Sequence, residues 1–314
     1  MTVELRRFPA VSVEAIVELW NQALPRDPIT IRRFTNLFLL DPNFDPTGLQ
    51  LAIDGDRLVG VMYGVRRLVP LHGGDLEPDQ GWIGFFFVHP EFRRLGIGSR
   101  LMHQTLRWLD RPIVSFSPTT PNYFLPGLDA TEYPAAEEFL TEHGFSLQYE
   151  AVAMDRSLHD YRVPGQARDA IRSLEGRGYR FGSPGVDDLV ELISLARDHF
   201  NPDWGRAIRE AVAAGLPLDR IVLARGPAGT LVGWAMHGTY EGVIERFGPF
   251  GVRSECRGTG LGRALLYLTL ERMRAQGAHS AWFLWTAENS PAGFLYRKAG
   301  FATTRTFRIM RKSA

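Results

Sequence analysis

The pattern of apolar and polar positions predicts the same opening elements in each half of the chain. Apolar residues at strand spacing occupy 3–8 and 179–181, and each run is followed by apolar residues at helical spacing, at 12–24 and 186–196. A cluster of Pro and Asp follows each predicted helix. The second half of the sequence therefore restarts with the elements that open the first half.

A hairpin pattern follows in both halves. Residues 51–61 alternate around an Asp54-Gly55-Asp56 turn, and residues 221–234 do so around a turn at 226–229. The second strand of each hairpin contains Leu-Val-Gly, with an offset of 173 residues (231 minus 58). The repeat thus extends beyond the first strand and helix.

An Arg-x-x-Gly-x-Gly sequence occurs once in each half, after an apolar run and before a long amphipathic run. The copies begin at Arg93 and Arg257, 164 residues apart (257 minus 93), and Val88 and Val252 lie five positions before them. Backbone N–H groups packed closely at the positive end of a helix bind pyrophosphate. A single copy is often only a strand-to-helix turn, but two copies in matching positions predict a phosphate loop in each half.

The elements after the two loops also match. Amphipathic runs predict helices at 99–109 and 263–276, and apolar runs predict strands at 112–116 and 280–285. Each half then has a Gly-Phe pair that opens a last strand. Two unrelated domains with a similar alternation are the alternative, but the shared order favours duplication and fusion.

The repeat predicts an α/β fold of two tandem domains. We expect the N-terminal domain at 1–155, a linker at 156–177 where apolar clusters are few, and the C-terminal domain at 178–314. A chain of 314 residues is long enough for two such cores. A fused pair imitates a homodimer, so we expect either a monomer with pseudo-dimeric domains or a homodimer.

The composition limits the expected class of binding partner and the expected cellular compartment. The 36 basic and 35 acidic residues nearly balance, so we expect a small-molecule partner, with no nucleic acid and no membrane surface. No apolar run reaches the roughly 20 residues of a membrane span, and no signal-peptide core opens the chain. The single cysteine, Cys256, permits no disulfide framework, and these features together predict a cytoplasmic protein.

The cysteine and the histidines of the sequence do not indicate a further catalytic or metal site. Cys256 precedes Arg257, where positive charge favours a thiolate, but no neighbouring histidine pairs with it, so a small residue in a turn is the preferred interpretation. The histidines lack metal-ligand spacing, so we expect no metal site.

The motifs together resemble those of GCN5-related N-acetyltransferases in a tandem arrangement. The resemblance is carried by Val-x-Pro with Arg-x-x-Gly-x-Gly at 88–98, by its counterpart at 252–262, and by Asn-Ser-Pro-Ala-Gly-Phe-Leu-Tyr-Arg-Lys-Ala-Gly-Phe at 289–301. It implies a mixed, splayed sheet flanked by helices in each domain. It also implies an acyltransferase that moves acetyl from acetyl-CoA, its co-substrate, directly to a primary amine of a small molecule.

The resemblance assigns cofactor contacts in both halves. In the second half they are Val252, Arg257, Gly258, Thr259, Gly260, Leu261, Gly262, Arg263 and Asn289. In the first half they are Val88, Arg93, Arg94, Gly96, Ile97 and Gly98. Tyr296 is the implied acid that protonates the departing thiolate, since a phenol donates a hydrogen bond across neutral pH.

The first half departs from the family pattern after its loop. Aligning Gly144 with Gly300 places Leu140 where Tyr296 stands, and it places Tyr133 where Asn289 stands. We therefore expect catalysis in the C-terminal half, with the N-terminal half structural or ligand-binding. Catalysis in the N-terminal half, with water or a residue outside the motif as acid, stays open.

A base for the amine is displaced from its family position. The resemblance implies a Glu six residues before Val252, but Arg246 occupies that position and Glu245 precedes it. Strand alternation turns Glu245 to the other face unless the Gly-Pro-Phe-Gly run at 248–251 makes a bulge. Glu245 is the candidate base, with pairing to Arg246 as the alternative, and weaker candidates are His199, Asp203 and Glu288.

Two further alternatives remain. A non-catalytic acyl-CoA-binding or sensing protein would keep both loops without acetylating an acceptor. The segment 121–129, which has no counterpart in the second half, either closes over a ligand with its aromatic residues or packs within its domain, and packing is preferred.

Overall fold

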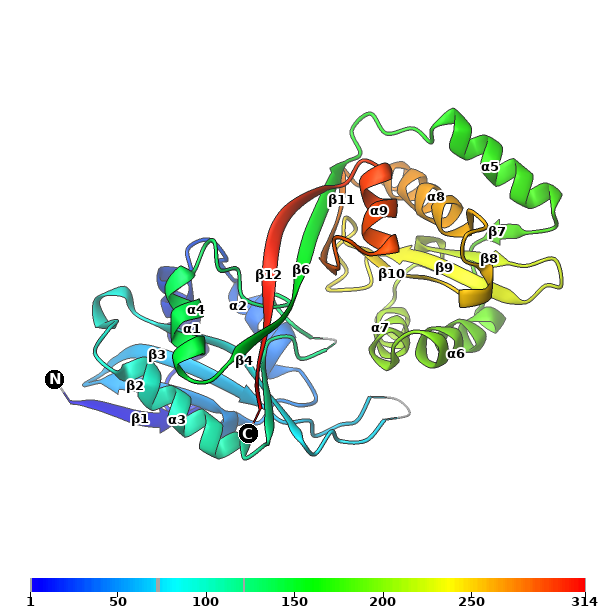
Figure 1. Cartoon of the computed structure of the whole chain (residues 1–314). Helices are drawn as coiled ribbons and strands as arrows, with labels where there is room; N and C mark the ends of the chain where they lie inside the picture. The colour runs from blue at the N-terminus through cyan, green and yellow to red at the C-terminus, as the bar shows by residue number, and fades with distance from the viewer. Residues whose placement is uncertain (1, 72–73, 121, 314) are drawn as a thin grey trace. The chain divides into compact units, whose positions relative to one another are not determined.

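The computed structural model describes residues 2–71, 74–120 and 122–313. The chain forms two compact units, which are described separately (Figure 1). The first unit contains Met1–Pro70, Gly74–Ala151 and Thr306–Ala314, and the second contains Leu71–Gly73 and Val152–Arg305. Helices flank mixed sheets in both units, as the sequence predicts.

Four antiparallel strands open the first unit, and a fifth strand pairs with the fourth in parallel. They are β1 (Val3–Arg7), β2 (Leu49–Asp54), β3 (Arg57–Val65), β4 (Gln80–Val88) and β5 (Ile113–Phe116). Helices cover both faces of this sheet, with α1 (Val13–Ala23) and α2 (Ile31–Phe34) on one core, and α3 (Ile97–Leu109) and α4 (Pro134–Glu142) on the other. Ser12 caps α1 by accepting a hydrogen bond from the Ala15 N–H, so the helix begins where the sequence predicts.

Strands β4 and β5 separate part of the way along their length. They pair from Gln80 opposite Ile113 to Ile83 opposite Phe116, and β5 then ends while β4 continues to Val88. Within the described residues, no strand pairs with Gly84–Val88 on this side. The backbone groups along this edge of β4 therefore have no strand partner there, and this is the splay that the family resemblance implies.

The second unit repeats this order of elements. Its four-stranded sheet contains β7 (Arg180–Gly182), β8 (Ile221–Arg225), β9 (Leu231–His237) and β10 (Phe247–Val252). On one face lie α5 (Gly165–Gly176), α8 (Leu261–Ala275) and α9 (Pro291–Lys298), and on the other lie α6 (Leu189–His199) and α7 (Pro202–Ala213). The pairing of β10 with β9 shifts register between Phe247 and Phe250, so the irregular strand predicted at 248–251 is confirmed.

Two long strands contribute to both units. They are β6 (Ser146–Ser157) and β12 (Ala302–Ser313), which are neighbours in the sheet order β1-β2-β3-β4-β5-β12-β6-β11 (Figure 1). The last residues of β12 pair with β5 in the first unit, and the end of β6 pairs with β11 (Ser280–Thr286) in the second. The C-terminal segment of the chain is therefore part of the N-terminal unit.

This division differs from the predicted one at two places. The segment predicted as a linker, 156–177, contains the end of β6 and all of α5. Helix α5 buries Ala167, Ile171 and Leu174 in the core of the second unit, because these residues lie on one face at helical spacing. The predicted C-terminal domain also loses 306–314 to the first unit, because β12 supplies a strand there.

A buried histidine makes the stability of the second unit depend on pH. His237 ends β9 and is fully buried, with its Nδ1 2.9 Å from the backbone oxygen of Ile244. Burial lowers the pKa of His237 from 6.5 to about 4. The unfolded chain therefore binds a proton below pH 6.5 that the folded chain binds only below about 4, so stability is full above pH 6.5 and is lost as pH falls toward 4.

We expect His237 to lower the free energy of unfolding by about 2 kcal/mol between pH 7 and pH 5. Urea unfolding at both pH values measures this loss. The His237→Gln side chain is neutral at pH 7 and at pH 5, so the loss of unfolding free energy between these pH values should be smaller in this variant than in the wild type by about 2 kcal/mol. His159→Gln, at an exposed histidine, should show the same loss as the wild type. Equal losses in the wild type and His237→Gln would contradict the assignment.

Candidate active site

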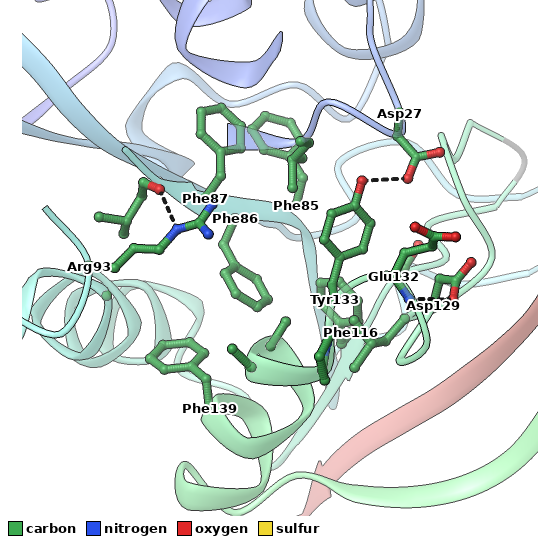
Figure 2. Close-up of a pocket in the computed structure, with 18 of the residues that line it drawn as sticks. Asp27, Phe85, Phe86, Phe87, Arg93, Phe116, Asp129, Glu132, Tyr133 and Phe139 are labelled. Carbon is green, nitrogen blue, oxygen red and sulfur yellow. Dashed lines mark hydrogen bonds between the residues drawn. The ribbon is translucent and has the colours of Figure 1, made fainter. Parts of the chain in front are cut away.

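A cavity of about 680 Å³ lies in the first unit, beside the free edge of β4 (Figure 2). Residues from both faces of the strand reach it, because β5 has ended and leaves the edge open. Its walls are mostly apolar and include many aromatic side chains, and the Gly loop before α3 closes one side. The aromatic lining residues are Trp20, Phe85, Phe86, Phe87, Phe92, Phe116, Phe124, Tyr133 and Phe139.

The first Gly loop presents backbone donors to open space. Gly96 adopts the left-handed conformation (φ 75°, ψ 1°) at the N-cap of α3, and no side chain caps the helix there. A Cβ built on Gly96 meets no described atom within 4 Å, whereas one on Gly98 would lie 3.2 Å from the Phe139 ring. Gly96, Gly98 and Ser99 line the cavity, so an anion in it could accept hydrogen bonds from the first turn of α3, which no side chain caps.

The second Gly loop has the same backbone conformation. Gly260 (φ 90°, ψ −1°) is the N-cap of α8, as Gly96 is of α3. Gly258 (φ 76°) stands where Arg94 (φ 63°) stands in the first loop, so both loops use a left-handed residue there. The repeat predicted from the two motifs thus extends to the backbone of the loops.

Arg93 anchors the first loop to the protein. Its Nε donates to the Val88 backbone oxygen at 3.1 Å, and its Nη2 donates to the Ala23 backbone oxygen at 3.0 Å. The guanidinium therefore joins the loop to the ends of β4 and α1, while Arg94 lines the cavity beside it. This positioning role is not apparent from the motif, which implies a cofactor contact for Arg93.

The other predicted cofactor residues lie along the two loops and their helices. Ile97 and Leu261 bury their side chains in the cores, so only their backbones can contact a ligand. Thr259 donates its hydroxyl to the Cys256 backbone oxygen at 2.7 Å, and burial raises the pKa of the Cys256 thiol, which agrees with the preferred structural interpretation of this cysteine. Val88, Val252 and Gly262 are half-buried, and the exposed residues are Arg257, Gly258, Arg263 and Asn289.

Tyr296 lies in the aromatic core of the second unit. Its ring centroid is 4.4 Å from that of Phe283 and 5.6 Å from that of Phe301, and burial raises the pKa of its phenol. Leu140, its counterpart in the first unit, is also buried. Tyr296 thus keeps its proton at neutral pH, as an acid must, but its ring is a core residue.

The four candidate bases have different surroundings. Glu245 is half-buried, and its backbone oxygen accepts a hydrogen bond from the Trp282 N–H at 2.9 Å. Arg246, its alternative partner, forms an ion pair with Glu241 at 3.1 Å. His199 lies 3.2 Å from Arg253, Glu288 accepts from Thr303 at 2.9 Å, and Asp203 is buried on α7.

Sequence reasoning missed a polar pair in the first unit. The Tyr133 hydroxyl donates to Oδ2 of Asp27 at 2.8 Å, and both side chains line the cavity (Figure 2). The segment 122–129 lies beside them, and its Phe124 both packs in the core and lines the cavity, while Pro121 lies outside the described residues. The only sequence signals were Asp27 in the Pro-Asp cluster after α1 and Tyr133 at the position of Asn289.

The model of the acetyltransferase (GNAT) family matches residues 13–119 and 189–301. The chain belongs to the GNAT family. Its two matches coincide with the two units around the Gly loops, so the tandem resemblance is confirmed, and GNAT membership makes the protein an acyltransferase. Acetyl transfer is the chemistry that the family and its relatives share.

Relatives and structural neighbours match most or all of the chain, across both units. Mycothiol acetyltransferase of Thermobispora bispora is 29% identical, covering 95% of each chain, and that of Saccharomonospora viridis is 28% identical, covering 70% of each. A GCN5-related N-acetyltransferase structure from Sphaerobacter thermophilus superposes with a TM-score of 0.73 at 17% identity, covering 99% of this chain and 95% of that one. A tandem GNAT protein from the clavulanic acid biosynthesis pathway gives 0.64 at 17%, covering 99% and 98%. These likenesses show the fold.

In the part of the chain that the structure describes, no helix is long and apolar enough to cross a bilayer. No group of three or more His, Cys, Asp or Glu side chains there is arranged to hold a metal ion.

Proposed function

We propose that the protein transfers the acetyl group of acetyl-CoA to a primary amine of a small molecule by direct attack. The observation that carries this proposal is the first-unit cavity, which joins the N-terminus of α3, uncapped by any side chain, to the part of β4 that has no strand partner on this side among the described residues. The loop suits a pyrophosphate and the strand edge suits the amides of a pantetheine arm. The aromatic walls suit a thioester kept from water.

Both units supply cofactor-binding residues in this proposal. The second loop has the backbone of the first, so acetyl-CoA would bind at both, and two sites per chain are expected. The contacts are those that the family motif assigns around the two loops. We place the protein in the cytoplasm, in keeping with its single cysteine, as a monomer with pseudo-dimeric units or as a homodimer.

The transfer needs no covalent enzyme intermediate. The amine nitrogen attacks the thioester carbonyl, backbone N–H groups hold the oxyanion, and CoA leaves as a thiolate. In the second unit, Tyr296 would protonate the thiolate and Glu245 would take the proton of the amine. The Tyr296 phenol carries a proton at neutral pH and can therefore be the donor, while burial raises its pKa and makes it a weaker acid.

Acetyl transfer is tested with three amines and one alcohol. The full-length protein is incubated with acetyl-CoA and tyramine, glucosamine or spermidine, and with glucose as the control that lacks an amine. Release of CoA thiol and a gain of one acetyl group in the product should occur with at least one amine and not with glucose. Calorimetric binding of acetyl-CoA without any acetylation would instead favour a non-catalytic acyl-CoA-binding protein.

Tyr296→Phe should lower turnover in the second unit by one or more orders of magnitude, because it removes the proposed proton donor. Tyr296→Phe is combined in one chain with Gly96→Asp, which puts a carboxylate in the first loop, and turnover is compared with that of Gly96→Asp alone. The measured turnover then comes from the second unit only. The phenylalanine preserves the ring in the aromatic core, so the protein should stay folded. Tyr149→Phe, at an exposed tyrosine, is the control, and unchanged turnover in Tyr296→Phe would reject the assignment.

A further inference from the structure

We propose that the first unit is itself a catalytic centre, in which Asp27 takes the proton of the acceptor ammonium and Tyr133 positions the Asp27 carboxylate. The inference rests on the proposed transfer of acetyl to an amine. It gives the N-terminal unit a base and a positioning residue, neither of which lies at the position equivalent to Tyr296 of the second unit. The proposal is based on the cavity and its lining residues, and not on the sequence motif around Leu140.

The backbone around Asp27 is fixed by two hydrogen bonds. Its N–H donates to the Leu24 oxygen at 3.0 Å, and its own oxygen accepts from Trp20 Nε1 at 2.8 Å. Trp20 is in turn fully buried among phenylalanines of the core. Asp27 as a whole is 8% exposed and lines the cavity, so it is held at the wall where an acceptor can reach it.

Tyr133 is held at both of its ends. Its backbone N–H donates to the Asp129 oxygen at 2.9 Å, and its hydroxyl donates to Asp27 Oδ2 at 2.8 Å. It is also the N-cap residue of α4, so the helix fixes its backbone. The pair therefore joins the segment after α1 to the start of α4 across one end of the cavity.

Four charged residues that line the cavity are labelled in Figure 2, and they lie on two sides of it. Figure 2 shows Arg93 on one side, and Asp27, Asp129, Glu132 and Tyr133 on the other, with Phe86 and Phe116 between them. The titratable groups that line the cavity are Asp27, Arg93, Arg94, Asp129, Glu132, Tyr133 and Glu142, and Glu132 also pairs with Arg26 at 3.5 Å. An anionic cofactor at the loop and an ammonium at Asp27 would both match the local charge, with the thioester against the phenylalanines between.

The reaction at this site converts an ammonium and a thioester into an amide, a thiol and a free proton. One proton passes from the ammonium to the Asp27 carboxylate, and the freed nitrogen lone pair attacks the thioester carbonyl carbon. The C–S bond breaks, the thiolate takes a proton, and the nitrogen loses its second proton as the amide forms. The products are the amide, the CoA thiol and one proton, which Asp27 releases to solvent. The Tyr133 hydroxyl keeps its proton throughout and orients the carboxylate.

The test uses the full chain with Gly260→Asp, which puts a carboxylate in the second loop, and the panel amine that the wild type acetylates fastest. Asp27→Asn keeps the shape and the hydrogen bond from Tyr133, and it should lower kcat at pH 7 about 10²-fold or more with an unchanged KM for acetyl-CoA. Its rate should recover about tenfold per pH unit as solution supplies the free amine. Tyr133→Phe should lower kcat about tenfold without that recovery, since Asp27 remains.

Asp56→Asn, in the exposed turn between β2 and β3, is the matched control and should leave kcat unchanged. Thermal unfolding of each variant separates lost chemistry from a lost fold. The inference is wrong if Asp27→Asn has the rate of its parent, or if the Gly260→Asp chain binds acetyl-CoA but acetylates nothing while the wild type does. A wild type that acetylates no amine would overturn the proposed function and this inference with it.

Discussion

A chain that ends at Arg305 should fail to fold its N-terminal unit, although the deletion removes only the C-terminal segment Thr306–Ala314. This segment forms the part of β12 that lies between β5 and β6, and its backbone pairs with β5 from Met310 opposite Phe116 to Ser313 opposite Ile113. Deleting it leaves one edge of β5 without its strand partner, although β5 still pairs with β4, and splits the sheet between β5 and β6. The splayed strand pair that forms the cavity would lose its support.

The deletion also removes apolar burial. Phe307, Ile309 and Met310 are all buried, and at about 1.5–3 kcal/mol each their loss is comparable to the net stability of a whole domain, about 5–15 kcal/mol. Arg308 exchanges backbone hydrogen bonds of 2.7 and 3.0 Å with Leu128, which lines the cavity. The wall of the cavity therefore depends on the last strand of the chain.

Hydrogen exchange of residues 80–116 in the full chain and in 1–305 measures this effect. Protection of β4 and β5 should be lost in the shorter chain, and a synthetic peptide of residues 302–314 should restore part of it. The fragment 1–155, the domain predicted from sequence, should be unfolded for the same reason. Native protection in either shortened chain would show that β12 is dispensable and that the predicted boundary is adequate.

Local features of the fold were predictable from sequence. The two Gly loops were located by their spacing, because a left-handed residue at the N-cap of α3 and of α8 favours glycine whatever the rest of the fold does. The irregular β10 was likewise predictable, since Pro249 cannot donate to a ladder. These features depend only on neighbours in the chain.

Long-range pairing was not predictable in the same way. The apolar pattern of β12 indicates a strand, but nothing in it states that the partner is β5, nearly two hundred residues earlier in the chain. Helix α5 lies in the predicted linker, where the sequence has few apolar clusters beyond one helical stretch, and the structure shows that this stretch packs its apolar face into the core of the second unit. The partner of a strand depends on contacts with residues that are far away in the sequence. A local apolar pattern carries no information about those contacts.

The candidate site also combines local features, which the sequence predicts, with long-range features, which it does not. The loops were found from the motif, but the cavity exists because β5 ends at Phe116 while β4 continues, and strand ends are weakly encoded. Asp27 and Tyr133 are 106 residues apart, and no spacing rule connects them. The predicted acid and base, Tyr296 and Glu245, came from a motif of the second half and stay predictions.

Gly96→Asp should abolish acetyl-CoA binding at the first loop. The glycine has room for a side chain and a backbone angle that Asp and Asn tolerate better than most residues, so the variant should fold. The new carboxylate would lie at the helix N-terminus that the pyrophosphate needs, and repulsion of about 1–4 kcal/mol at each close charge pair would weaken binding at least about 10²-fold. Calorimetric stoichiometry should fall from two sites to one.

Gly96→Asn is the matched control, because it imposes the same backbone cost without the charge. It should keep more of the binding than Gly96→Asp, and the difference between the two variants measures repulsion alone. Gly260→Asp and Gly260→Asn, at the equivalent left-handed position of the second loop, should behave in the same way at the other site. If the wild type binds one acetyl-CoA and only Gly260→Asp removes it, the cavity of the first unit holds no cofactor, and its shape serves another ligand.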